Sequence, residues 1–383
     1  MYYEKIRVKF IYKKRRIMLM EYVKVKLDKK AKLKQYLEKY QVDGILFHST
    51  VNRFWLSEFA SSEGYLLFTK TESILYLDGR YITAGKKETK NVTNVIEIKT
   101  NHPGGFFGIL QSDLVKNKVK TLAFESDYLT YLTYQNLTTN LSSVTLKPVD
   151  FSELRAIKTN SEIKALKQAC AIGDIAINNV INKIKVGMTE RQVEQIIINS
   201  FVEAGADKPS FDTIVASGWR GALPHGRATD KKIANNELIT IDFGCIYNGY
   251  CSDTTRTIGL VTPSSKMLEI YDVVYEAQSL GIHAIKPGVT TVMIDKICRD
   301  YIISKGYGEY FTHSTGHGIG IEIHEFPRVS PFCDVLLEPG MVITVEPGIY
   351  IPDLGGVRIE DDILVTENGF HLLTEAKREL ILI

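Results

Sequence analysis

The pattern of hydrophobic and polar residues predicts a mixed α/β arrangement in the first part of the chain. Apolar side chains recur at helical spacing over residues 30–40. Runs rich in β-branched and aromatic residues predict short strands at 42–47, 64–68, 73–77, 92–98, 121–124 and 144–146. We therefore expect roughly the first 150 residues to form a small α/β domain.

The pattern changes near residue 150. Beyond this point helical periodicity begins at Ser152 and predicts a long helix. Thr189 and Gln192 have the spacing of a capping box, which predicts the start of a second helix. From Phe211 onward the pattern predicts strands that alternate with glycine-rich turns.

These changes divide the chain into three expected parts. Residues 1–17 form a basic N-terminal extension, residues 18–150 an α/β domain, and residues 151–383 a second domain that contains the candidate chemistry. Two interpretations of the extension stay open. Either the protein starts at Met18 or Met20, or the extension is a strand with apolar side chains on one face, namely Ile6, Val8 and Phe10.

Composition and charge exclude several classes of protein. Hydrophobic residues make up 44% and charged residues 24% of the 383 residues, which excludes a largely disordered chain, a collagen-like fibre and a polytopic membrane protein. The formal net charge is +2, and the first sixteen residues hold seven of the 47 basic side chains but one of the 45 acidic ones. The remaining chain is mildly acidic, which argues against a nucleic-acid-binding protein.

Membrane insertion and disulfides are not expected either. No apolar run reaches the ~18 residues of a transmembrane helix, and the apolar stretch at residues 17–20 is too short for a signal peptide. The five cysteines form no C-x-x-C pair. This usage is typical of reduced thiols in a cytoplasmic protein.

The second domain contains two similar acidic segments. Residues 239–244 match residues 343–348, because each is a β-branched run that ends in a carboxylate with glycine two positions later. Each is followed by a second acid-bearing segment, at 250–253 and 357–360, so we expect two related hairpins that face each other. The four acids are Asp242, Asp253, Glu346 and Glu360.

The first hairpin can be examined geometrically. Asn248-Gly249 is typical of a two-residue hairpin loop, and with this loop Asp242 and Asp253 lie diagonally on one face, ~7–8 Å apart. Two carboxylates inside a β-rich core would repel each other and lose hydration, and a metal ion removes both penalties. The alternative is that one or both acids lie at strand ends in solvent.

Histidines add a second signal. Three of the eight histidines lie within residues 313–324, and glycines on both sides of His317 allow backbone to approach a site closely. The stretch lacks the H-E-x-x-H pattern of zinc-protease helices. One imidazole with four carboxylates suits Mn²⁺, Co²⁺ or Fe²⁺ better than a thiolate-rich zinc site, and such a set could hold two ions.

The second domain resembles the Xaa-Pro metallopeptidases, the aminopeptidase P and prolidase group of pita-bread-fold enzymes. Six segments resemble the motif series of this family in order: ASGWRGALPHG (216–226), IDFG (241–244), YCSDTTRT (250–257), TGHGIG (315–320), TVEPGIY (344–350) and GVRIED (356–361). Residues 52–56 and 77–81 resemble the family's creatinase-like domain more weakly. The implied fold is α/β, an N-terminal creatinase-like α/β domain followed by an α+β pita-bread catalytic domain.

The resemblance also implies a ligand set for two divalent ions, with Mn²⁺ expected first and Co²⁺, Fe²⁺ or Zn²⁺ as alternatives. Asp242 would bind one ion, Asp253 and Glu360 would bridge both ions, and His317 and Glu346 would complete the second.

The same resemblance implies residues that serve the substrate, a peptide with proline at its second position. His225, His313 and His324 would line the substrate site, with His324 near the scissile carbonyl, and Arg358 would support a ligand carboxylate. We expect a cytoplasmic homodimer that binds neither nucleic acid nor membrane. A hydroxide made available by the two cations would attack the carbonyl before proline.

Three alternatives differ in substrate or class. A dipeptidase needs a cation for the free prolyl carboxylate, and none of Arg220, Arg328 and Arg358 is uniquely placed in the sequence, so the sequence favours Xaa-Pro aminopeptidase over Xaa-Pro dipeptidase. Methionine aminopeptidase shares the fold and ligand types, but the N-terminal domain and residues 216–226 argue against it. The intact acids argue against a metal-free binding protein on a retired peptidase fold.

Overall fold

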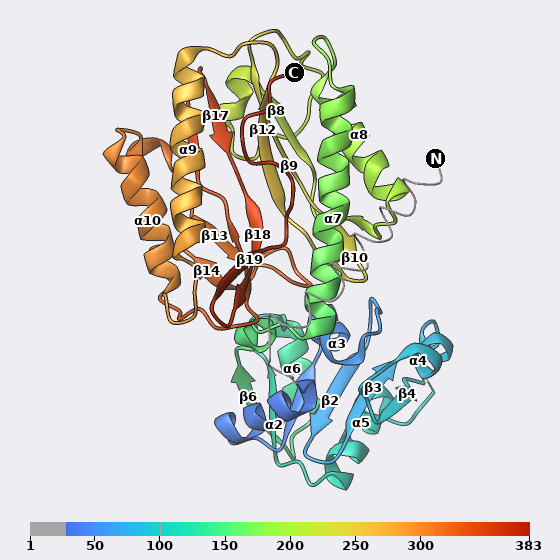
Figure 1. Cartoon of the computed structure of the whole chain (residues 1–383). Helices are drawn as coiled ribbons and strands as arrows, with labels where there is room; N and C mark the ends of the chain where they lie inside the picture. Colours follow the sequence, from blue (N-terminus) through green and yellow to red (C-terminus); the bar gives the residue numbers. More distant parts are fainter. Residues whose placement is uncertain (1–27, 100) are drawn as a thin grey trace, which may run out of the picture. The chain divides into compact units, whose positions relative to one another are not determined.

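The computed structural model describes residues 28–99 and 101–383, and the extension expected at residues 1–17 lies outside the described residues. The chain forms two compact units (Figure 1). Among the described residues, the N-terminal unit comprises residues 28–99 and 101–154, and the C-terminal unit comprises residues 155–383. Within the described residues, no helix combines the length and the apolar composition needed to span a bilayer.

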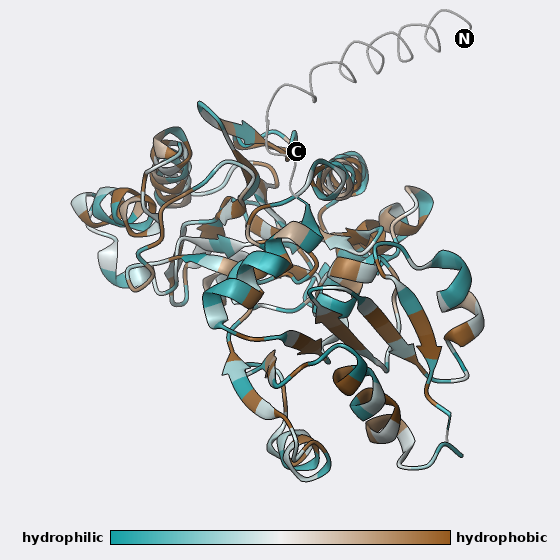
Figure 2. Ribbon diagram, turned by 90° about the horizontal axis from the view of Figure 1, so that it is seen from below, coloured by the Kyte–Doolittle hydropathy of each residue, from teal (hydrophilic) through white to brown (hydrophobic). Residues whose placement is uncertain are grey.

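The N-terminal unit is built on one six-stranded sheet with the strand order β4-β3-β2-β1-β5-β6. The strands are β1 (Gly44–Phe47), β2 (Tyr65–Thr69), β3 (Ser73–Leu77), β4 (Asn94–Glu97), β5 (Thr121–Glu125) and β6 (Thr145–Val149). The helices are α2 (Lys29–Tyr40), α3 (Thr50–Ser57), α4 (Ile82–Glu88), α5 (Gly105–Lys116) and α6 (Tyr131–Asn140). Consecutive residues of β1 and β3 are buried, so both faces of the sheet centre are covered. Figure 2 shows largely brown strands beside helices with teal faces.

Two helix pairs flank the strands of the C-terminal unit (Figure 1). They are α7 (Asn160–Lys183) with α8 (Glu190–Glu203), and α9 (Ser265–Ala284) with α10 (Thr291–Ser304). The apolar faces of α7 and α8 pack against β9 and β12, whereas α9 and α10 pack against strands of the second hairpin. Each helix begins after a serine or threonine whose side chain accepts a backbone N–H, and this hydrogen bond sets where the helix starts.

The helix boundaries confirm one prediction and correct two. The predicted capping box at Thr189 and Gln192 is present. The helix expected from Ser152 instead starts at Asn160, because Thr159 and Glu162 form a capping box there and Ser152–Arg155 is a separate 3-10 helix, η1. The expectation of strands and turns alone after Phe211 was wrong, since it missed α9 and α10.

The strands of the C-terminal unit form four small sheets. One sheet has the order β12 (Thr254–Gly259), β9 (Leu238–Phe243), β8 (Ile214–Ser217), and another has β11 (Tyr250–Cys251), β10 (Cys245–Tyr247), β7 (Lys208–Pro209). The largest has the order β14 (Glu325–Val329), β13 (Gly316–Gly318), β15 (Val342–Val345), β18 (Asp361–Thr366), β19 (Gly369–Leu372). The fourth pairs β16 (Gly348–Ile351) with β17 (Gly355–Arg358). Two 3-10 helices, η2 (Gly218–Ala222) and η3 (Gly308–Tyr310), lie in the loops.

The C-terminal unit repeats one plan twice, a helix pair followed by an acidic hairpin. The linkers within the two helix pairs share the pattern I-K-x-G-x-T, at residues 184–189 and 285–290. Gly187 and Gly288 take nearly the same left-handed conformation, with φ of 87° and 83°. This arrangement explains why the two acidic segments resemble each other in sequence.

Candidate metal centre

The first acidic hairpin has the register predicted from its loop. Asn248 and Gly249 have φ of 50° and 79°, the two positive values of a type I′ turn, and Tyr247 pairs with Tyr250. Beyond the loop the ladder is interrupted; it resumes with Phe243 opposite Thr254, and Asp242 pairs with Thr255. Asp253 therefore lies where β11 passes into β12, between two sheets.

The second hairpin is interrupted at the corresponding place. Val345 pairs with Asp361 in the large sheet, and Gly348 pairs with Arg358 in the two-stranded sheet. Glu346 and Glu360 lie in the interruption between these paired stretches. In each hairpin, side chains at such an interruption can turn away from the sheet faces towards the other hairpin.

The two hairpins are bonded to each other, as the sequence predicted. The N–H of Glu360 donates to the carbonyl of Thr255 at 3.1 Å, and the Thr257 hydroxyl donates to the carbonyl of Arg358 at 2.9 Å. The N–H of Asp253 donates to a carboxylate oxygen of Asp362 at 2.9 Å. These contacts bring the acids of both hairpins into one buried cluster.

His317 joins this cluster with its Nε2 atom. Asp253, His317 and Glu360 each offer a ligand atom within 4.8 Å of the others. Nε2 of His317 lies 3.4 Å from Oε1 of Glu346 and 3.6 Å from Oδ2 of Asp253. Its Nδ1 atom lies 3.0 Å from the Gly318 carbonyl, a partner that requires the proton on Nδ1, so the Nε2 lone pair of the neutral ring faces two carboxylates.

The electrostatics of the cluster are unfavourable without a cation. Burial, and then repulsion from the neighbouring acids, holds the pKa values of Asp253 and Glu360 well above their usual range. Burial also raises the pKa of Glu346 to about 8, with Asp242 adding to the rise. Burial and the nearby His324 lower the pKa of His317 to about 3, so this ring does not supply a positive charge at neutral pH.

Two buried oxygens of the cluster have no hydrogen-bond partner among the described residues, Oδ1 of Asp242 and Oε1 of Glu360. A buried carboxylate oxygen is normally hydrogen-bonded or bound to metal. Carboxylates with one neutral imidazole form an oxygen-rich donor set of the kind that divalent first-row ions accept. The residues present therefore fit a divalent metal centre.

Arg358 supports the acids from the side. Its Nη2 donates to Oδ2 of Asp242 at 2.6 Å, which leaves Oδ1 for the cluster. Its Nε donates to the Thr255 hydroxyl at 3.1 Å, and that hydroxyl donates to Oε2 of Glu360 at 2.7 Å. Arg358 thus orients one acid of each hairpin, a role of the kind expected from the sequence.

Tyr350 links Arg358 to His313. Nη1 of Arg358 lies 2.7 Å from the Tyr350 oxygen, which lies 2.8 Å from Nε2 of His313. Nδ1 of His313 faces the Ser314 carbonyl at 2.7 Å, so Nε2 accepts the tyrosine proton. Burial lowers the pKa of His313 to about 4 and raises that of Tyr350 to about 12, which keeps both groups neutral. The sequence motif contained Tyr350, but only the geometry gives it a role.

The other two histidines lie at the exposed edge of the cluster. His324 packs edge-on against His317, with ring centroids 4.3 Å apart. Its pKa is lowered by partial burial and then by the charges of Arg328 and His225. His225 is exposed and also contributes to the lowered pKa of His313, so it lies near both of the other predicted substrate-site histidines.

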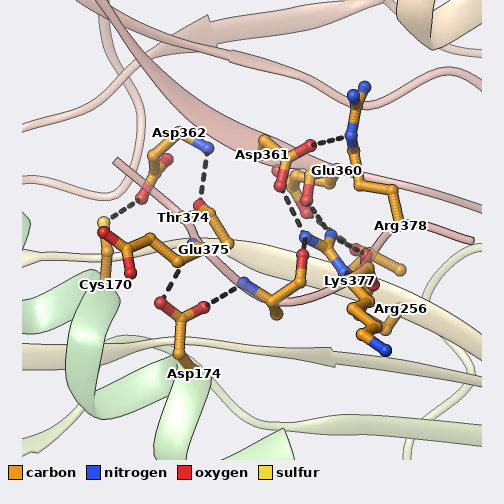
Figure 3. Close-up of polar contacts among 12 residues, drawn as sticks. Cys170, Asp174, Arg256, Glu360, Asp361, Asp362, Thr374, Glu375, Lys377 and Arg378 are labelled. Carbon is orange, nitrogen blue, oxygen red and sulfur yellow. Dashed lines mark hydrogen bonds and ion pairs between the residues drawn. The ribbon is translucent and has the colours of Figure 1, made fainter. Parts of the chain in front are cut away.

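The segment between β17 and β18 that carries Glu360 is held in place by Arg256 (Figure 3). This buried guanidinium donates to the carbonyl of Glu360 at 2.5 Å and to Oδ1 of Asp361 at 2.6 Å. It also donates to the carbonyls of Ala376 and Lys377 in the C-terminal tail, at 2.8 and 2.9 Å. The tail therefore contributes to the position of an acid that is distant in sequence.

Asp253 is fixed in a similar way by the acid Asp362, whose contact with Cys170 is drawn in Figure 3. Besides the N–H of Asp253, Oδ2 of Asp362 accepts the Cys170 thiol at 3.2 Å. Burial raises the pKa of Asp362 to about 7 and holds that of the Cys170 thiol well above its usual value. The sequence offered no local signal for these contacts, because they join residues about a hundred or more positions apart.

Comparisons with known proteins agree with the fold class expected from the sequence. Residues 164–367 match the family model "Metallopeptidase family M24", and residues 29–157 match "Creatinase/Prolidase N-terminal domain". The chain is 41% identical over 357 residues to an Xaa-Pro dipeptidase of Pyrococcus horikoshii, covering 92% of this chain and 99% of that protein. It is 41% identical over 335 residues to a putative Xaa-Pro aminopeptidase of Mycoplasma genitalium, covering 87% and 92%. The solved structure of an Xaa-Pro dipeptidase from Bacillus anthracis superposes with a TM-score of 0.88 at 42% identity, covering 93% of this chain and 99% of that one.

Proposed function

Because the chain belongs to metallopeptidase family M24, we propose that it is a two-metal peptidase that cleaves the bond before proline in Xaa-Pro substrates. The observation that carries the metal assignment is the neutral His317, whose Nε2 lone pair faces buried carboxylates. Two anions and a lone pair oppose one another at these distances unless a cation lies among them.

Five residues would hold the ions, as the resemblance implied. Asp253 and Glu360 would serve both ions, Asp242 would complete one site, and His317 with Glu346 would complete the other. When bound, the ions acidify a water molecule and polarise the scissile carbonyl. We propose Mn²⁺ as the metal on the chemistry of the donor set, which is oxygen-rich and contains no thiolate.

The remaining residues of the site orient groups and move protons. Nη2 of Arg358 donates to Oδ2 of Asp242 and leaves the other oxygen, Oδ1, for the cluster. His324, at the exposed edge, is placed to stabilise the developing oxyanion of the substrate or to pass a proton to the prolyl nitrogen. His225 and His313 complete the substrate-facing rim, with His313 held neutral by burial.

Substrate length depends on whether a cation is available for the prolyl carboxylate. Arg220 is committed, because it forms an ion pair with the buried Glu190. Arg358 is committed to Asp242 and Tyr350. Arg328 remains, since it is exposed and lies directly across the strand pair from His317.

The positions of these three arginines change the choice between aminopeptidase and dipeptidase that the sequence favoured. The charge of Arg328 contributes to the lowered pKa values of His317 and His324, which indicates that it lies near the substrate side of the cluster. A guanidinium there is suited to a free carboxylate. We therefore propose Xaa-Pro dipeptides as the preferred substrates. Xaa-Pro aminopeptidase activity is the second candidate, supported by the similarity to the Mycoplasma genitalium protein.

The test is kcat/KM for Ala-Pro, Ala-Pro-Ala and Ala-Ala with added Mn²⁺. We expect Ala-Pro to be cleaved best and Ala-Ala not at all. Arg328→Ala should lower kcat/KM for Ala-Pro by ~10–100-fold, because one charged hydrogen bond is worth ~1.5–3 kcal/mol, and should leave Ala-Pro-Ala unaffected.

The control variant is Arg80→Ala, which removes another exposed arginine, one that pairs with Asp78 in the N-terminal unit. It should not change the ratio between the two substrates. Preference for Ala-Pro-Ala with no selective effect of Arg328→Ala would instead support the aminopeptidase. Cleavage of none of the proline peptides would disprove the proposed function.

A further inference from the structure

The carboxylate of Glu190, in the first turn of α8, is completely buried, with 0% of the residue exposed. It accepts the N–H and the hydroxyl of Ser217, both at 2.9 Å. It also accepts the N–H and the hydroxyl of Thr229, at 3.0 and 2.7 Å. An ion pair with Arg220 completes its surroundings. Five donors around one anion offset the large cost of burying its charge.

These donors belong to one loop, residues 218–228 with its two flanking residues, which we call the His225 loop. Ser217 ends β8 at the start of the loop, and Thr229 follows its last residue. Arg220 lies in η2 within the loop and donates a further hydrogen bond to the carbonyl of Arg227 at 2.8 Å. A single carboxylate therefore joins the beginning, the interior and the end of the loop.

The opposite side of the loop rests on the strand that carries Arg358. A Cβ atom at Gly356 would lie 2.1 Å from the carbonyl oxygen of Gly221, so the two backbones touch. Nη1 of Arg358 donates to the carbonyl of Pro224 at 3.2 Å. The residue after Pro224 is the exposed His225. The loop is thus held at its base by Glu190 and at its tip by β17.

We propose that Glu190 is a positioning residue that holds the His225 loop in one conformation and so presents His225 to the substrate. The catalytic part of this inference rests on the proposed peptidase function, whereas the loop-fixing part does not. Glu190 also keeps the charge of Arg220 paired below the loop, where it does not compete for a substrate carboxylate.

The test uses Glu190→Gln with Glu125→Gln as a matched control. A glutamine keeps the shape of Glu190 but lacks the charge that pairs with Arg220. Its amide NH₂ group is also a hydrogen-bond donor, and it would face the donors of Ser217 and Thr229 without an acceptor. Glu125 is another buried carboxylate that accepts the N–H groups of His48 and Ser49, at 2.6 and 2.8 Å, in the N-terminal unit. Both variants remove one buried negative charge, but only Glu190→Gln removes it from the His225 loop.

The first readout is amide hydrogen exchange of peptides that cover residues 218–228, and it requires no activity. Glu190→Gln should accelerate exchange there by ~10–100-fold, the equivalent of ~1–3 kcal/mol for a disrupted buried hydrogen-bond group. Glu125→Gln should leave this peptide unchanged. Unchanged exchange in Glu190→Gln would overturn the proposal. If Glu190→Gln does not fold, Glu190→Gln/Arg220→Met removes the unpaired guanidinium and is measured in the same way.

The second readout is a double-mutant cycle with His225→Ala on kcat/KM for Ala-Pro. We expect Glu190→Gln to cost ~10-fold in the wild-type background and little in the His225→Ala background, because both changes act through one side chain. A purely structural role predicts equal effects in both backgrounds and would overturn the proposal. If the wild-type chain cleaves no proline peptide, the proposed function fails, and hydrogen exchange alone decides whether Glu190 fixes the loop.

Discussion

At the scale of single residues, one hydrogen bond decides what His317 can do. Because the N–H at Nδ1 donates to the Gly318 carbonyl, only Nε2 is available to bind a cation. A ring with the opposite tautomer would point a proton at the cluster and would bond the carboxylates directly. The hydrogen bond to the Gly318 backbone therefore makes His317 suitable as a metal ligand. Without it, the ring could instead form an ion pair with the carboxylates.

The structure places His324 beside His317 without bringing it among the groups that meet at the cluster. We expect His324→Ala to retain its metal and to lose turnover by ~10²–10⁴-fold, the usual range for a lost acid–base or oxyanion contact. Metal content and kcat are measured on the same preparation. His283→Ala, at an exposed position of α9, is the control and should change neither. Metal loss in His324→Ala would place this side chain among the ligands.

The sequence could name the residues that bring chemistry but not those that orient them. The sequence identifies Asp242, Asp253 and Glu360 because a charged residue is unusual in an apolar strand and therefore indicates a function. Tyr350 and Thr255 do not, since a tyrosine or threonine in a strand is ordinary. Their roles depend on the register between two hairpins, which no local pattern encodes.

At the scale of elements, each acidic hairpin is useful because its ladder is interrupted. Gly244 lies at the first interruption, and a Cβ atom there would be 1.9 Å from the carbonyl oxygen of Ser252. The close approach brings the chain before Asp253 against β9. A side chain at position 244 would push this segment away from the cluster.

We therefore expect Gly244→Ala to lower the free energy of unfolding by ~1–3 kcal/mol or more, as overpacking does in a dense interior, and to weaken metal binding. Denaturant unfolding and metal content are the measurements. Gly173→Ala in α7 is the matched control, because its nearest neighbour would be an ordinary 3.5 Å contact with Phe243. Equal stability of the two variants would contradict the importance of this close contact.

The elements that the sequence predicted correctly have local causes. Asn248-Gly249 determines the hairpin loop, and the capping box at Thr189 determines the start of α8. The start of α7 was also signalled locally, by Thr159 and Glu162, but the apolar periodicity before it was misleading. Residues 156–158 are instead drawn into a bridge between Ile157 and Met341, a tertiary contact.

At the scale of the whole molecule, the buried acids of the two hairpins lie close together in the C-terminal unit, and their negative charge has to be neutralised by protons or by a cation. Without metal, burial raises the pKa of Glu346 from 4.5 to about 8, and it raises those of Asp253 and Glu360 as well. The folded chain then binds protons more tightly than the unfolded chain between these pH values. The lowered pKa values of His313 and His317 act in the opposite direction, but only below the ordinary histidine value of 6.5. Above that value the stability falls as pH rises towards 8.

The homodimer expected from the sequence stays a prediction.

We expect the melting temperature of the chelated protein to fall between pH 6.5 and pH 8, and that of the Mn²⁺-loaded protein to fall less. The gap between the two should widen with pH, because the cation replaces protons that the acids otherwise hold. Thermal unfolding of both forms across this range is the measurement. A gap that narrows as pH rises would contradict the assignment of these acids to a metal centre.

A metal titration tests the central claim most directly. The claim is that the paired acids and His317 hold the ions on which proline-peptide cleavage depends. The chain is freed of metal with a chelator, and hydrolysis of Ala-Pro is followed as Mn²⁺ is returned. We predict no turnover at the start, a rise to a plateau at two ions per chain, and neither metal binding nor turnover in Asp253→Asn. Full turnover in the metal-free chain, or in metal-free Asp253→Asn, would contradict the account.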